Sequence, residues 1–156
     1  MKQIVTIARA LKEKNRVAGR LVKARELVGS ENSKDKSVPR GVDVAVMYAQ
    51  AKELRDRLIA IKSAIAEANK PIVSKIIELD EIKSEIAFLN GLNVKEGKFV
   101  TTNYGSRIES EIDAVIRKQQ VLDEIAALQA RADRLQDELD EFNATTKIVI
   151  EIEVDG

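Results

Sequence analysis

The sequence of 156 residues contains no cysteine and no histidine. Without thiolate or imidazole ligands, the usual structural zinc sites are excluded. The Ser-His-Asp and Cys-His catalytic arrangements are also impossible within this chain, and so are the Glu-x-x-His pairs of helical di-iron proteins. We therefore expect no catalytic residue, no metal and no cofactor. One alternative stays open, a carboxylate site assembled from separate helices.

Aromatic residues are scarce, at 3% of the chain with no tryptophan, and the apolar content is mainly Leu, Ile, Val and Ala. This composition suits helix packing and suits the stacking of nucleic-acid bases poorly. No run approaches the roughly 18 apolar residues that span a bilayer, and residues 1–10 do not resemble a signal peptide. We expect one globular domain over 1–156 in the cytoplasm, or in a virion if phage-encoded, with neither membrane nor nucleic acid as a partner.

Charge of each sign is concentrated in one half of the chain. Residues 1–78 carry 17 Lys and Arg against 9 Asp and Glu, a balance of +8, and residues 79–156 carry 9 against 17, a balance of −8. The split favours basic and acidic helices that lie against each other or against a second subunit. A nucleic-acid site in the basic half is the weaker interpretation, because binding usually needs an uncompensated patch.

Apolar residues at helical spacing predict two helices in the first half. The first runs from Ile4 to Val28, and residues 29–41 form an exposed loop rich in turn formers. Asp43 is the expected N-cap of the second helix, which ends at Asn69, where the left-handed cap and the following proline stop it.

The second half predicts a third helix over 71–90 and a short strand over 98–102. Ser106 with Glu109 matches a capping box and predicts a fourth helix from Arg107 to Phe142, about 50 Å long. An early apolar stripe at residues 108, 112 and 115 is out of step with the later stripe, which predicts a stutter. The fold class is thus mainly all-α: an antiparallel four-helix bundle of two helical hairpins with a short β element at about 98–102 and 147–154.

The C-terminal residues 147–156 alternate between apolar and polar and predict a β-strand tail. A lone strand is unstable in water, so it needs a partner, either residues 98–102 or an edge on another subunit. The residues expected to form this interface are Ile148, Ile150, Ile152 and Val154.

Three sequence features suggest chemistry only weakly. Residues 91–98 resemble a phosphate loop, but five residues separate the glycines and Phe99 stands where Ser or Thr would bind magnesium. The carboxylates near 78–81 and 137–141 are interpreted as solvated acidic faces with ion-pair partners rather than a cation site. Asn69 and Asn143 are interpreted as helix caps rather than recognition residues.

The whole pattern resembles a family of small bacterial helical proteins described as septicolysin-like, whose function is not established. The resemblance rests on ARALKEKNRVAGRLVKAREL near the start, IAEAN, IIELDEIKSEIAFLNGL, KFVTT and ELDEFNATTKI. It covers nearly the full length and implies a helical fold rather than an activity. The family often has tryptophan after the final asparagine, where this chain has Ala144.

The expected function is a non-enzymatic protein that forms homo-oligomers. The second interpretation is a structural component of a phage or other assembly that contacts its neighbours, or another protein partner, through the C-terminal strand. A carboxylate-based enzyme or metal carrier is the third.

Overall fold

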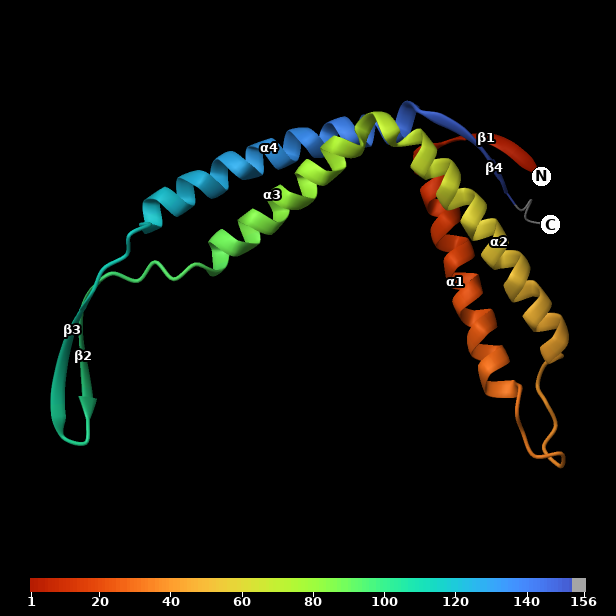
Figure 1. Ribbon diagram of the computed structural model, residues 1–156, viewed down its shortest axis with the longest axis horizontal. Coiled ribbons are helices and arrows are strands. Elements are labelled where there is room, and N and C mark those ends of the chain that lie inside the picture. The colour runs from red at the N-terminus through yellow and green to blue at the C-terminus, as the bar shows by residue number, and fades with distance from the viewer. Residues whose placement is uncertain (153–156) are drawn as a thin grey trace. The chain divides into compact units, whose positions relative to one another are not determined.

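The computed structural model describes residues 1–152 and is mainly α-helical, with two small antiparallel sheets of two strands each (Figure 1). The elements follow in the order β1 (Lys2–Thr6), α1 (Ile7–Glu31), α2 (Val44–Ala68), a 3-10 turn (Lys70–Ile72), α3 (Val73–Gly91), β2 (Gly97–Asn103), β3 (Ser106–Ile112), α4 (Lys118–Thr145) and β4 (Lys147–Glu151). They divide into two compact units. The first comprises Met1–Ile72 with the residues from Asp140 on, and the second comprises Val73–Leu139.

Helices α1 and α2 form an antiparallel pair in the first unit (Figure 1). The apolar seams of these helices supply its core, together with Ile150 of β4 and Ile152, which follows that strand. The cluster comprises Ala10, Val17, Leu21, Ala24, Ala51, Leu54, Ile61, Ile65, Ile150 and Ile152. The predicted N-cap is confirmed, because the Asp43 carboxylate accepts a hydrogen bond of 3.1 Å from the Val46 N–H.

Strand β4 pairs with β1, which the sequence analysis did not predict. The predicted helix start at Ile4 was wrong, since residues 2–6 form a strand and α1 begins at Ile7. The register places Lys2 opposite Glu151, Ile4 opposite Val149 and Thr6 opposite Lys147. The predicted pairing of the C-terminal strand with residues 98–102 was therefore wrong, because β2 pairs with β3 and β4 pairs with β1.

Hydrogen bonds hold both ends of this sheet. The Met1 ammonium donates to the Ile152 carbonyl at 3.1 Å, and the Ile152 N–H donates to the Met1 carbonyl at 3.0 Å. At the other end the Ile7 N–H donates to the Thr146 carbonyl at 2.9 Å. Thr6 caps α1 by accepting from the Arg9 N–H, which satisfies one of the free donors of the first turn.

A β-hairpin connects α3 to α4 in the second unit, and it extends beyond the ends of the two helices that it joins (Figure 1). The predicted helix start at Arg107 was wrong, because residues 106–112 form β3 and α4 begins at Lys118. The turn residues Tyr104 and Gly105 both have positive φ, 48° and 80°. Two such residues match the tight turns whose twist suits a hairpin, so Ser106 pairs with Asn103 rather than capping a helix.

The later seam of α4 is buried or half-buried as predicted, with Val121, Ala132, Leu135 and Leu139 buried. The helix ends later than predicted, at Thr145. Asn143 therefore lies inside α4 and does not cap it. Asn69 does occupy the C-cap of α2, in right-handed rather than left-handed geometry, with its N–H donating to the Ile65 carbonyl at 2.9 Å.

Candidate interaction surface

The hairpin β2–β3 has one apolar face and one charged face. Its register pairs Phe99 with Ser110, Thr101 with Ile108 and Gly97 with Ile112. Because side chains alternate across a strand, Phe99, Ile108 and Ile112 share one face. The other face carries Lys98 opposite Glu111, Val100 opposite Glu109 and Thr102 opposite Arg107. The result is an amphipathic two-stranded ribbon.

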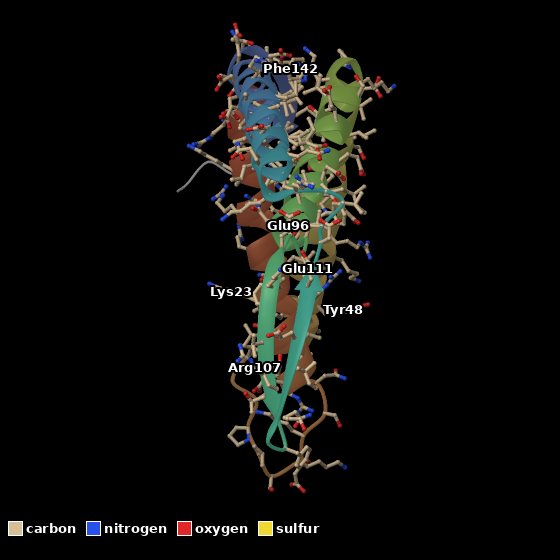
Figure 2. All side chains as sticks on the ribbon, turned by 90° about the vertical axis from the view of Figure 1, so that its left-hand side faces the viewer. Lys23, Tyr48, Glu96, Arg107, Glu111 and Phe142 are labelled. Carbon is tan, nitrogen blue, oxygen red and sulfur yellow. The ribbon has the colours of Figure 1, made fainter. Side chains whose placement is uncertain are left out.

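Both faces of the ribbon are open to solvent. Every residue of β3 is exposed, and in β2 only Phe99 is half-buried. Ile108 is 53% exposed and Val100 is 51% exposed, while Lys95 lies over the Phe99 ring at 3.9 Å. Figure 2 shows Arg107 towards the turn of the hairpin and Glu111 nearer its base. A two-stranded ribbon is marginally stable alone, so this one is suited to gain stability from an added surface.

Two ion pairs join α3 to α4 within the second unit. Arg131 donates two hydrogen bonds to Glu78, at 2.7 and 2.9 Å, and Lys75 pairs with Glu138. The Arg131 hydrogen bonds lower the pKa of Glu78, and the Lys75 hydrogen bond lowers the pKa of Glu138. One carboxylate in each of the acidic faces expected near 78–81 and 137–141, Glu78 and Glu138, thus has a cationic partner.

Residues 91–98, whose sequence resembles a phosphate loop, do not have the structure of a phosphate loop. Gly91 is the last residue of α3, and Gly97 is the first residue of β2 with φ of 117°. A phosphate loop joins a strand to the N-terminus of a helix, whereas this loop leaves a helix and enters a strand. Within residues 1–152, no group of three or more acidic side chains is placed to hold a metal ion.

A buried charge cluster lies in the first unit, where α1, α2 and β4 meet. Glu13 is 4% exposed and accepts hydrogen bonds from Arg16 at 2.9 and 3.1 Å. Arg57 also donates to Glu13, and to the Glu151 carbonyl at 3.3 Å. Arg57 lines an open groove of about 640 Å³ that also contains Arg20 and Glu53. Since the groove carries both signs of charge and its guanidinium is engaged by Glu13, the cluster is best explained as a structural clamp.

Three of the four residues expected to form an interface pack in or against the core of their own chain. Ile150 is 4% exposed and Ile152 is 5% exposed, both in the core of their own chain, and Ile148 packs partly buried against that core. Val154 lies outside the described residues. The face of β4 that carries Ile148 and Ile150 therefore covers α1 and α2 of the same molecule.

The hairpin was missed although the sequence carries a signal for it. Residues 106–112 alternate with a period of two, with Ile108 and Ile112 on one side and three charged residues on the other. Tyr104-Gly105 supplies a turn centred on a glycine with positive φ. Residues 108 and 112, which were interpreted as part of a helical stripe out of step with the rest, belong instead to strand β3.

Comparison with protein-family models, with curated proteins and with solved structures gives no match for this chain. Across residues 1–152, no helix is both long and apolar enough to cross a bilayer.

Proposed function

We propose that this chain is a non-enzymatic protein that associates with copies of itself, and that the exposed hairpin β2–β3 takes part in that contact. The observation that supports the proposal is the exposure of Ile108 and Ile112 on the apolar face of one ribbon. Apolar side chains gathered on an exposed element mark interaction surfaces more often than apolar side chains scattered singly.

Helix α3 adds a second apolar surface in the same unit. Val73, Ile77 and Phe88 are 50%, 58% and 56% exposed, although they belong to a helix that also buries Leu79 and Leu89. A helix with apolar residues on several sides is typical of one that is covered on several sides. This supports an assembly in which the second unit is covered by a neighbour.

Several expectations from the sequence belong to this proposal. They include the antiparallel four-helix bundle and the single domain. The septicolysin-like resemblance is supported by sequence motifs alone. The alternative function, a structural component of a phage or other assembly, would use the same surface. A homo-oligomer and such an assembly are both built from repeated contacts between copies.

Sedimentation velocity of the full chain tests self-association. Over about 1–100 µM we expect the mass to rise above that of the monomer with concentration, as mass action requires. Ile108→Ser on the hairpin should weaken association severalfold. Ile59→Ser on α2 is the matched control, since Ile59 is 57% exposed, close to the 53% of Ile108.

A monomer at every concentration would overturn the proposal. Equal weakening by both variants would show that general surface apolarity, rather than the hairpin, drives association.

A further inference from the structure

We infer that two copies join through the free edges of their β3 strands, which pair antiparallel around Ile108 and form a four-stranded sheet β2–β3–β3–β2. This inference rests on the proposed self-association and names its surface and register. The occupant of the exposed edge is thus a second copy of this chain.

The hairpin leaves two charges without an opposite charge across the strand. Glu111 lies opposite Lys98 in the same ribbon, so this pair is matched. Arg107 lies opposite Thr102, and Glu109 lies opposite Val100. Arg107 and Glu109 contact each other along β3 only at 3.7 Å, and they are 72% and 75% exposed. The free edge therefore presents a positive and a negative side chain two residues apart.

The backbone of β3 allows only some registers. The pair that flanks a two-residue turn exchanges hydrogen bonds, and hydrogen-bonded and non-hydrogen-bonded pairs then alternate. Asn103 and Ser106 flank this turn, so Arg107, Glu109 and Glu111 direct their N–H and C=O groups away from β2. A second β3 strand must pair through these three residues.

Charge then selects one register from this set. Pairing around Ile108 places Arg107 opposite Glu109 of the second copy and Glu109 opposite its Arg107. A shift of two residues in one direction sets Arg107 against Arg107. A shift in the other direction sets Glu109 against Glu109, and it places Arg107 opposite Glu111, whose charge Lys98 already matches within its own ribbon. Opposite charges that face each other stabilise a sheet and like charges destabilise it. The chosen register also places the two Ile108 side chains together on the apolar face.

Disulfide trapping tests the register directly, because the chain has no cysteine of its own. Ile108→Cys should form a covalent dimer on mild oxidation, since directly opposed residues in a non-hydrogen-bonded pair have Cα atoms about 4.5 Å apart, within disulfide range. Ser110→Cys is the matched control on the same strand and face. In this register its two copies lie about 13 Å apart, four residues out of step, and should not cross-link.

Charge reversal gives a second, independent readout by sedimentation. Arg107→Glu alone and Glu109→Arg alone should each raise the dimer dissociation constant about tenfold, because two attractive pairs become repulsive. The double variant R107E/E109R should restore wild-type association, because the exchanged charges again face each other. Arg107 and Glu109 also contact each other along one strand, so a mixture of the two single variants separates the two explanations. Each single variant carries like charges within its own hairpin, and only a contact between copies restores association, as a heterodimer.

The outcomes separate this inference from the proposed function. Association of the wild type with cross-linking of Val100→Cys instead of Ile108→Cys would assign the contact to the β2 edge and overturn the inference alone. Association without rescue by the double variant would also overturn it alone. A wild type that stays monomeric would overturn both.

Discussion

The buried residue Glu13 shows how one charge can hold three elements together. Its carboxylate accepts hydrogen bonds from Arg16 on α1 and from Arg57 on α2, and Arg57 reaches the backbone of β4. Burial of a charge is costly unless it is paired. The cluster therefore stabilises the structure in which α1, α2 and β4 pack together, relative to structures in which one of these elements is detached.

Removal of the Glu13 carboxylate should be strongly destabilising. Glu13→Ala leaves Arg57, whose side chain is 12% exposed, without its main counter-charge, and we expect a loss of about 3 kcal/mol in the free energy of unfolding. Urea unfolding measures the change. Glu67→Ala is the control, since the Lys70–Glu67 pair is about 70% exposed on both sides and should contribute less than about 0.5 kcal/mol. Equal losses would contradict a stabilising role for the buried pair.

The sheet of β1 and β4 divides its residues sharply between core and solvent. Along β4, Ile150 is 4% exposed and Val149 is 56% exposed. Adjacent residues of a strand point to opposite faces, so neighbours of similar chemistry differ in what they stabilise. The sheet is therefore a cover for the α1–α2 pair.

Substitutions at these adjacent positions should differ accordingly. Ile150→Ala should lower the free energy of unfolding by about 3 kcal/mol, because it leaves a cavity in the core. Val149→Ala should change it by less than about 0.5 kcal/mol, as surface substitutions usually do. Thermal and urea unfolding of both variants provide the comparison. A similar cost at both positions would mean that β4 does not cover the core.

The elements differ in how far the sequence predicts them. Helix α2, Val44–Ala68, matches the predicted N-cap at Asp43 and the predicted end at Asn69, because a long seam and a capping residue agree. Strand β1 was missed because Ile4 and Val5 fit a helical stripe as well as a strand over so short a segment. The pairing of Lys2 with Glu151 has no local signal at all, since it depends on a core that must assemble first. The hairpin, in contrast, was predictable from its own period and turn.

At the scale of the whole molecule, a net charge of zero conceals two units of opposite sign. The first unit carries 17 Lys and Arg against 13 Asp and Glu, a balance of +4, and the second carries 9 against 13, a balance of −4. The contrast between the units is half that between the two halves of the sequence, +8 and −8, because the acidic C-terminal residues belong to the first unit. Acidification removes the negative charge of the second unit and adds to the positive charge of the first.

Acid should therefore weaken the ion pairs that join α3 to α4. Because the pKa of Glu78 in the folded state is lowered by Arg131, its contribution is complete above the unfolded pKa of about 4.3 and is lost as pH falls through the lower folded value. Glu78→Gln should lower the melting temperature at pH 7, and the difference from wild type should shrink as pH falls and vanish once Glu78 is protonated in the folded state. Glu124→Gln, an exposed carboxylate of α4, serves as control. A difference that persists in acid would rule out the ion pair as its cause.

The discontinuous first unit also sets an order of events during synthesis. Helix α2 is complete at Ala68, yet Ile150 and Ile152, which finish the core around it, follow about 80 residues later. At translation rates of about 5–20 residues per second, the α1–α2 pair waits roughly 4–16 s for its last strand. During that interval the seam of α2 is open to chaperones and to other nascent chains. Contacts with other molecules can therefore form on the seam of α2 before β4 pairs with β1 and covers it.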